Sequence, residues 1–287
     1  MKKLIIGVFA LSVFMLFTIT SANALTMFAN SATWGPDLVH ELDITGGSGT
    51  LVQNYTVSTG NGRGVVVMDD IIYSTESGPG GDPFGGSNII YKTDRTTGLS
   101  LGTITVSGLP TGAAMSTLAW DGTTFWTSEY LGGNHAYQID TSGNIIKTIT
   151  LGLAINNMDG MEYFDGKLIS NRGDTIGPYD VYDLDGNVLS ASFINPSLNG
   201  CSATTGIAFD GDYFYTSCIY SAYLQQWDGT TGAFIQNIGL SGGSFLIEDL
   251  SVDYALRDDI KVPEPSTLLL LGSGLIGIVF YRRMRRV

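Results

Sequence analysis

Short apolar runs, separated by turns that contain aspartate and glycine, follow one another along the middle of the chain. At Asp121-Gly122 one apolar run ends and a second follows at once, and the same order recurs at residues 162–170 and 207–216. Asp-Gly between two β-rich runs is a strong hairpin signal, because glycine tolerates positive φ. No segment between the two chain ends shows a 3.6-residue apolar period. The pattern therefore predicts an all-β domain built from hairpins.

The hairpins recur at a regular interval. Asp121, Asp165 and Asp210 are 44 and 45 residues apart, and a weaker copy lies at residues 66–73. Between these copies lies a second hairpin pattern, in which a strand ends in an aspartate: Asp43, Asp94, Asp140, Asp183 and Asp228. Two hairpins in about 45 residues make four strands, which is the period and strand count of a β-propeller blade. The recurring aspartates are expected to form turns rather than to bind ligands.

Five four-stranded blades account for the whole repeat. Four are expected at residues 65–107, 117–152, 158–195 and 204–240. The fifth is expected to close the ring, with inner strands from residues 247–260 and outer strands from residues 36–58. Pairing N- and C-terminal strands in this way hides two sheet edges. The alternative is a β-sandwich or jelly roll, which also has short strands and glycine turns. A sandwich or jelly roll does not predict hairpins that recur about every 45 residues, so the propeller is favoured.

The N-terminal end differs in composition from this repeat. Lys2 and Lys3 precede an apolar run from Leu4 to Ile19, and Ala22-Asn23-Ala24 has the pattern of a cleavage site. A basic start, an apolar stretch and small residues in this order are typical of a secretory signal peptide. We therefore expect residues 1–24 to direct the chain to the Sec translocon and then to be removed. The alternative is a buried N-terminal helix.

The C-terminal end carries three features in a fixed order. Pro263-Glu264-Pro265 is followed by the apolar run Leu268–Tyr281 and then by the basic residues Arg282, Arg283, Arg285 and Arg286. The apolar run is slightly short for a span of about 20 residues. Arginines can extend such a span by snorkelling, and they hold that end in the cytoplasm. We expect residues 263–287 to form a transmembrane helix with a basic tail.

On these residues, the chain resembles the PEP-CTERM sorting signal. The resemblance implies processing by an exosortase, a membrane transpeptidase-like cysteine protease of Gram-negative bacteria. It also implies transient anchoring in the inner membrane, release to the cell surface or extracellular matrix, and a link with exopolysaccharide. The alternative is a plain C-terminal anchor. Residues 25–262 then form the exported β-propeller-like domain between the two end segments.

The charge of residues 25–262 limits the partners of this domain. It contains eight basic and 26 acidic residues. Such a surface repels nucleic acid, because nothing neutralises the phosphates. Extracellular polysaccharide and other surface proteins remain as candidate partners, and they are the ones that the resemblance favours.

Few residues of the domain at 25–262 are candidates for a catalytic or metal-binding site. His40 and His135 are the only histidines, and there is no Cys-x-x-Cys pair, so no structural zinc or other cofactor is expected. No Gly-x-Ser-x-Gly motif indicates a serine nucleophile. Cys201 and Cys218 are predicted to form a disulfide, whose loop of about 18 residues contributes roughly 3 kcal/mol in the chain-entropy model. The alternative is that both are free and buried.

Four carboxylates are expected near the central channel of the propeller. They are Asp159, Glu162, Glu248 and Asp249. A pair at a suitable separation could hydrolyse a glycosidic bond, and several together could bind Ca²⁺. The simpler alternative is that they are solvated loop acids in an acidic domain.

Two functions follow. The favoured one is a non-enzymatic binding or structural module, which a channel filled by apolar residues such as Met115, Met158 and Met161 would support. The alternative is a secreted polysaccharide hydrolase or lyase that uses the channel carboxylates. Tyr130, Tyr179 and Tyr220 are candidate sugar-stacking residues, unless they pack between blades.

Overall fold

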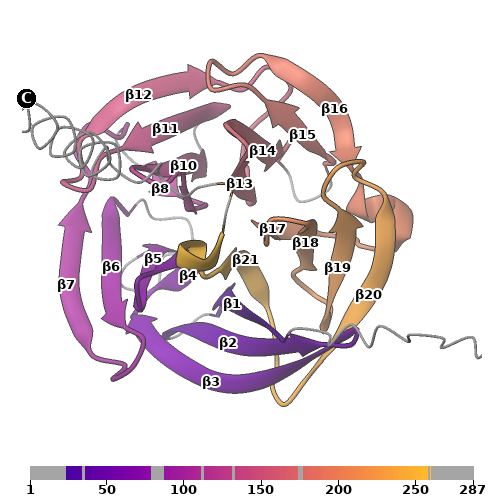
Figure 1. Ribbon diagram of the computed structural model, residues 1–287. Helices are drawn as coiled ribbons and strands as arrows, with labels where there is room; N and C mark the ends of the chain where they lie inside the picture. Colours follow the sequence, from indigo (N-terminus) through magenta and orange to yellow (C-terminus); the bar gives the residue numbers. More distant parts are fainter. Residues whose placement is uncertain are drawn as a thin grey trace, which may run out of the picture.

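Five β-sheet blades are arranged around a central axis in the computed structural model of the protein, and the strands of the fourth and fifth blades join into one eight-stranded sheet (Figure 1). The structure describes residues 24–33, 36–78, 87–110, 113–130, 133–173, 177–257 and 259. The predicted signal peptide, apart from Ala24, and the predicted sorting tail lie outside these residues. No helix within the described ranges is long and apolar enough to cross a membrane. The predicted β-propeller is confirmed.

Four blades are each formed by one continuous segment of chain. The first contains β4 (Asn61–Met68), β5 (Ile71–Ser77), β6 (Ile89–Asp94) and β7 (Ser100–Thr105). The second contains β8 (Ala114–Met115), β9 (Ala119–Trp120), β10 (Phe125–Tyr130), β11 (His135–Ile139) and β12 (Ile145–Thr150), with β8 and β9 both paired to β10. The third contains β13 (Met161–Phe164), β14 (Lys167–Asn171), β15 (Tyr179–Tyr182) and β16 (Val188–Ile194), followed by the 3-10 helix η1 (Pro196–Asn199). The fourth contains β17 (Thr204–Phe209), β18 (Tyr213–Cys218), β19 (Tyr223–Asp228) and β20 (Phe234–Ser241).

The fifth blade closes the ring with strands from both ends of the domain. Its order from the axis outward is β21 (Ile247–Val252), β1 (Leu25–Ser31), β2 (Asp37–Thr45) and β3 (Ser48–Ser58). Strands β1 and β21 are antiparallel, with Met27 opposite Val252 and Asn30 opposite Asp249. A short parallel pairing of β20 with β3 joins this blade to the fourth.

The division of the closing blade differs from the prediction in one respect. Residues 247–260 supply one inner strand rather than two, because Tyr254–Leu256 forms the 3-10 helix η2. The second strand is β1, which lies before residue 36, the expected start of this blade. None of its seven residues is charged and the last five are buried, so its burial pattern lacks the alternation of a half-exposed strand.

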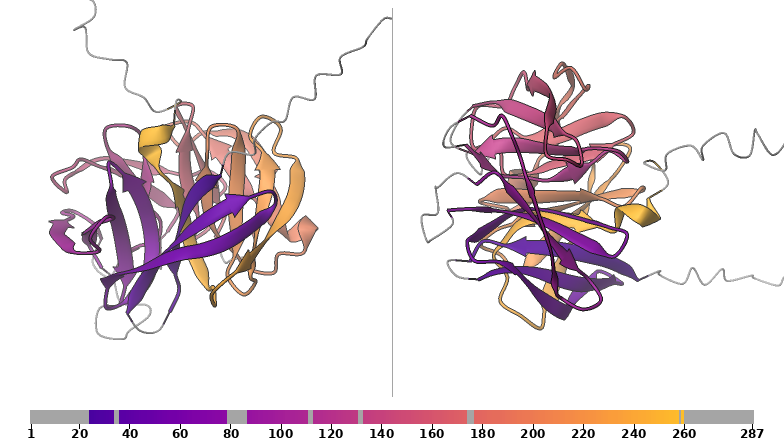
Figure 2. Two further views of the ribbon diagram at one scale, coloured as in Figure 1. Left: turned by 60° about the horizontal axis from the view of Figure 1, so that its bottom comes forward. Right: turned by 90° about the vertical axis from the view of Figure 1, so that its left-hand side faces the viewer.

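All the innermost strands run in the same direction along the axis. The turns between first and second strands, and those between third and fourth strands, therefore fall on one face, which we call the hairpin face. The helix η2 follows β21 on this face, as Figure 2 shows. The opposite face carries the starts of the innermost strands and η1.

The predicted role of the recurring aspartates as turn formers is confirmed at six of the eight positions. The Oδ1 atom of Asp140 accepts hydrogen bonds from the backbone N–H groups of Ser142 and Asn144, both at 2.9 Å. Asp121 accepts from Thr123 and Thr124 in the same way. Similar bonds form at Asp94, Asp183, Asp210 and Asp228. These carboxylates thus satisfy backbone donors that the turns leave outside the sheets.

The hydrophobic core lies between neighbouring blades. Met115 belongs to a cluster between the first and second blades, and Met158 and Met161 belong to one between the second and third. All three methionines are fully buried. They therefore hold adjacent blades together, which is the packing that a ring of repeats needs.

Candidate functional site

Where the innermost strands begin, Arg63 holds two of the four predicted carboxylates. The guanidinium of this β4 residue forms an ion pair with Glu248 of β21 and lies 3.7 Å from Oδ1 of Asp159. It also lies over the ring of Tyr130, 4.3 Å from the ring centroid. Arg63, Glu248 and Asp159 are 5%, 3% and 2% exposed, so water has little access to this cluster. We call Arg63, Glu248, Asp159 and Tyr130 the arginine cluster.

Burial and the guanidinium act in opposite directions on this cluster. Burial raises the pKa of Glu248, and the charge of Arg63 opposes that rise. Burial disfavours the charged form of Arg63, but the carboxylates of Glu248 and Asp159 outweigh it and raise the pKa of the guanidinium. The arginine therefore stays charged, and a charge-assisted network closes this end of the axis.

Asp249 lies deeper along the axis, in a position that glycine occupies in three other blades. Gly64, Gly160 and Gly206 each immediately precede an apolar residue of an innermost strand, as Asp249 precedes Leu250. The Oδ2 atom of Asp249 accepts the backbone N–H groups of Val65 at 3.0 Å and Leu118 at 3.3 Å. The residue is fully buried, and burial raises the pKa of its carboxyl well above the ordinary range. One side chain therefore connects three blades at the axis.

Glu162 lies at the other end of the axis, beside η2. Its Oε1 is 3.0 Å from Nη1 of Arg257 and also accepts the hydroxyl of Tyr254. Arg257 donates further to the Tyr163 carbonyl and forms a 2.7 Å ion pair with Asp259. Burial raises the pKa of Glu162, and Arg257 again opposes the rise. We call Arg257, Glu162, Tyr254 and Asp259 the C-terminal clamp.

The four predicted carboxylates are therefore distributed over three places. Asp159 and Glu248 share Arg63, Asp249 bonds to backbone amides, and Glu162 belongs to the clamp. None of the four is more than 3% exposed. Within the described ranges, no three His, Cys, Asp or Glu side chains are placed to hold a metal ion. The arrangement can fix strands to one another, but it offers no solvent-open pair of carboxylates to a substrate.

The basic partners of these acids could not be predicted from the sequence pattern. Arg63 and Glu248 are 185 residues apart, and Arg257 and Glu162 are 95 apart. Only the closing of the ring brings each pair together. One signal was present: the domain has eight basic residues, so each one that follows an apolar or glycine-rich run is a candidate for a buried pair.

The predicted tyrosines and histidines have different surroundings. Tyr179 is fully buried and donates to the Thr205 carbonyl, so it does not present a sugar-stacking surface. Tyr220 is 75% exposed. His40 is buried in β2 with Nδ1 2.6 Å from Asn54 Oδ1, and burial lowers its pKa. His135 has Nδ1 2.8 Å from Glu129 Oε1.

Cys201 and Cys218 form a disulfide with a Cα–Cα separation of 5.6 Å. The bridge connects the loop after η1 to the end of β18. It therefore fixes the start of the fourth blade against its second strand. Both residues are buried, and their role is structural.

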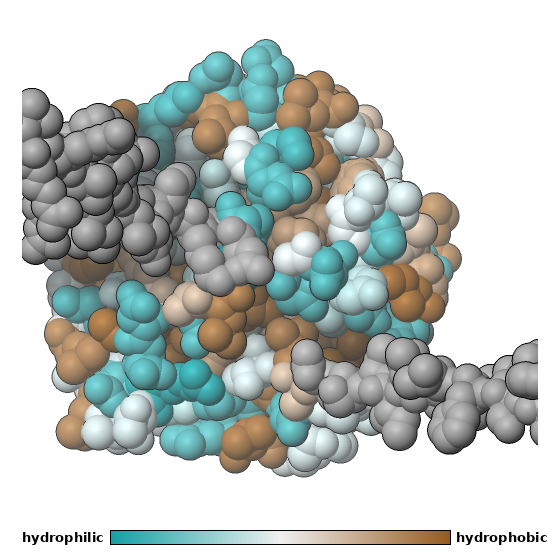
Figure 3. All heavy atoms as spheres, viewed as in Figure 1, coloured by the Kyte–Doolittle hydropathy of each residue, from teal (hydrophilic) through white to brown (hydrophobic). Residues whose placement is uncertain are grey.

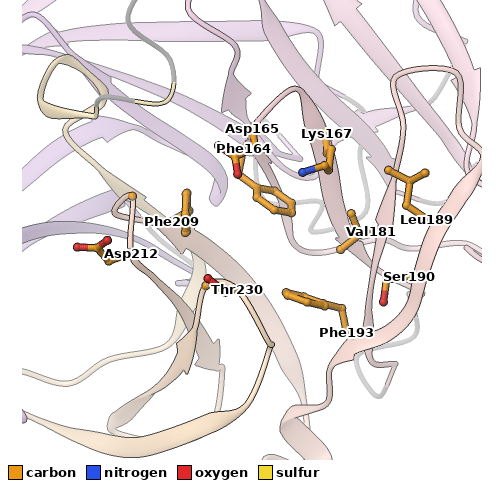
Figure 4. Close-up of a pocket in the computed structure, with 12 residues that line it drawn as sticks. Phe164, Asp165, Lys167, Val181, Leu189, Ser190, Phe193, Phe209, Asp212 and Thr230 are labelled. Atoms are coloured by element: carbon orange, nitrogen blue, oxygen red, sulfur yellow. The ribbon is translucent and has the colours of Figure 1, made fainter.

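A cavity of about 390 Å³ lies between the third and fourth blades. Its apolar lining includes Phe164, Phe193 and Phe209, which Figure 4 shows around the opening. Phe164 and Phe209 are in edge contact, with ring centroids 5.6 Å apart. Polar side chains also line it, among them Asp165, Lys167, Ser190, Asp212 and Thr230. An aromatic lining with a few polar groups, and a volume of this size, are typical of small-molecule sites.

Residues 261–286 match the family model of the PEP-CTERM protein-sorting motif. Among solved structures, the domain resembles a chain of the nidogen/laminin complex, at 12% identity and a TM-score of 0.52, over 81% of this chain and 99% of that one. A second similar structure is glutaminyl cyclase from Myxococcus xanthus, at 12% identity and a TM-score of 0.44, over 71% and 77% of the two chains. No curated protein matches the sequence. The first likeness supports the propeller fold alone. The chain carries a PEP-CTERM sorting motif, which marks it as an exported protein whose membrane-anchoring tail is processed by an exosortase.

Proposed function

We propose that the exported domain is a non-enzymatic binding and structural module of the cell surface or extracellular matrix, and that it binds extracellular polysaccharide. The observation that carries this proposal is the arginine cluster. It holds Asp159 and Glu248 in a buried ion-pair network, so these carboxylates support the ring instead of a reaction. The sorting motif supports this location, because it marks the protein for export.

The cavity between the third and fourth blades is the proposed binding site. Phe193 is partly exposed and suits the apolar face of a sugar ring, with the buried rings of Phe164 and Phe209 packed behind it. The surrounding hydroxyl, ammonium and carboxylate groups suit the hydroxyls of the sugar. Leu189 lines this cavity and is 54% exposed, so a ligand can reach the lining without unfolding the blade.

A glycan array tests this proposal, with purified residues 25–262 as the probe and mass spectrometry of the glycans in the same wells. Binding without cleavage is expected, and Leu189→Asp is expected to abolish it by placing a charge against the apolar lining. Leu101→Asp is the matched control, because Leu101 occupies the equivalent position on β7 and is 46% exposed. Cleaved glycans would contradict the proposal and favour the alternative hydrolase or lyase. Equal binding by both variants would place the ligand elsewhere, and no binding to any glycan would exclude a polysaccharide partner among those on the array.

A further inference from the structure

The two ends of the described domain are neighbouring antiparallel strands. Met27 of β1 lies opposite Val252 of β21, and Cα atoms paired in this way are about 4.5–5.5 Å apart. Strand β1 begins two residues before this pair, at Leu25, and the chain leaves β21 one residue after it, at Asp253. Both ends therefore lie side by side on the hairpin face, close to η2 (Figure 2).

Each end leads directly into a segment that contacts the membrane during export. The predicted signal peptide ends at Ala24, immediately before β1. The sorting motif begins at residue 261, four residues after Arg257. Both attachments to the membrane therefore start from one face of the ring, and the opposite face has none.

The C-terminal clamp holds the chain against that face. Arg257 is 1% exposed and is paired with Glu162 and Asp259. Asp259 also lies 3.4 Å from the backbone N–H of Asp165, in the β13–β14 turn. Arg257 and Asp259 are thus held against this face, and eight residues separate Asp259 from the apolar run at Leu268.

This length limits how the domain can face the membrane. Eight extended residues span at most about 28 Å. A domain of this length has a radius of gyration of about 18 Å, hence a width of about 45 Å. The connecting segment cannot reach around the ring, so the opposite face cannot approach the lipid while the tail is anchored.

The hairpin face is also strongly acidic. Among the described residues, fourteen aspartates lie in or next to its turns or in the clamp, against the basic residues Arg95, Lys147, Lys167 and Arg257. Figure 3 shows hydrophilic and hydrophobic residues interspersed on this face. A membrane surface with anionic lipids attracts basic segments and repels acidic ones within about a Debye length, roughly 8–10 Å at physiological salt.

We infer that the hairpin face is turned toward the membrane while the sorting tail is anchored, and that its acidic turns prevent adsorption to anionic lipid, so that cleavage of the tail frees the domain. The opposite face, with η1 and the starts of the innermost strands, is then the one directed away from the membrane. This inference requires the anchoring tail that the motif marks, but it does not depend on whether the domain binds a glycan.

Fluorescence energy transfer in reconstituted vesicles tests the orientation. The full chain is placed in vesicles that contain anionic lipid and an acceptor dye on the lipid headgroup. A donor is attached to Ser142→Cys, in an exposed turn of the hairpin face, or to Ser197→Cys, exposed in η1 on the opposite face. Transfer is expected to be several-fold stronger from position 142. Equal transfer, or stronger transfer from position 197, would overturn the inference.

Two further samples separate tethering from adsorption. Insertion of about 20 glycine and serine residues between Ile260 and Lys261 lengthens the connecting segment, so the difference between the two positions should become small. If the difference persists, the face itself binds lipid and the repulsion is wrong. Labelled residues 25–262, added to the same vesicles at low salt, should give no transfer from either position. Transfer from position 142 in that sample would contradict release on cleavage.

Discussion

Gly206 packs directly against the backbone of Asp249. A Cβ atom on Gly206 would lie 2.4 Å from Asp249 Cα and 2.6 Å from the Leu250 nitrogen. The two residues occupy equivalent positions in neighbouring blades, and the glycine leaves room for the backbone of Asp249, whose side chain bonds to Val65 and Leu118 of two other blades. Closure of the ring at this point depends on glycine on one side and a hydrogen-bonding carboxylate on the other.

Gly206→Ala should destabilise the domain, because the added methyl would meet backbone atoms that cannot move without separating two blades. Overpacking of this kind typically costs about 1–3 kcal/mol. The free energy of unfolding, from denaturant titration, measures the effect. Gly239→Ala is the control: a Cβ there meets nothing within 4 Å, so a change of less than about 0.5 kcal/mol is expected. Equal losses in the two variants would contradict the close packing.

Arg63→Met should leave Glu248 and Asp159 buried without their cation. Removal of one partner from a buried ion pair costs about 3–5 kcal/mol. The double variant Arg63→Met/Glu248→Gln should recover part of that loss, since one of the uncompensated charges is removed. Arg95→Met is a matched control, because Arg95 pairs with Glu41 in a more exposed place and should cost at most about 1 kcal/mol. Similar losses for the two single variants would contradict a structural role for the arginine cluster.

The buried carboxyl group of Asp249 should make the free energy of unfolding fall as the pH rises. Burial raises the pKa of Asp249 in the folded state, so this group favours folding below its ordinary range and opposes folding as the pH rises through its raised pKa. Denaturant titrations from about pH 4 to pH 8 should show wild-type stability falling more steeply than that of Asp249→Asn.

Asp140→Asn should have the opposite effect. Hydrogen bonds from the Asn144 side chain and backbone lower the pKa of Asp140, so its contribution is present above the ordinary aspartate range and is lost as the pH falls. The variant should therefore lose stability at neutral pH relative to wild type, and the two proteins should converge in acid. Parallel pH profiles for Asp249→Asn and wild type would contradict the buried state of Asp249.

Reduction of the disulfide should weaken the fourth blade. The 201–218 bridge closes a loop of about 18 residues, which corresponds to roughly 3 kcal/mol in the chain-entropy model. The paired variant Cys201→Ser/Cys218→Ser should lose about that amount, and a reducing agent should lower wild-type stability without affecting the variant. A loss caused by the reducing agent in the variant would show that another group is responsible.

The sequence pattern predicted the features that depend on local spacing, but not the contacts that form only when the ring closes. The spacing of Asp121, Asp165 and Asp210 indicated the blades because each aspartate forms a turn within its own hairpin. Strand β1 was missed because it is buried on both sides and lies beside the predicted signal peptide. The inner-strand prediction for residues 253–260 failed because η2 and the C-terminal clamp form only against β13, about 90 residues away in sequence. The pairing of Arg63 with Glu248 is likewise a product of the closed ring.

Mass spectrometry of the extracellular protein, from cells that contain an exosortase, tests the account most directly. Export and sorting predict a chain that begins at Leu25 and has lost the apolar run from Leu268 together with the arginine tail. Pro263→Ala/Glu264→Ala should retain the tail and remain in the membrane fraction. An extracellular protein that keeps residues 268–287, or a wild-type chain that stays intact in the membrane, would contradict the account.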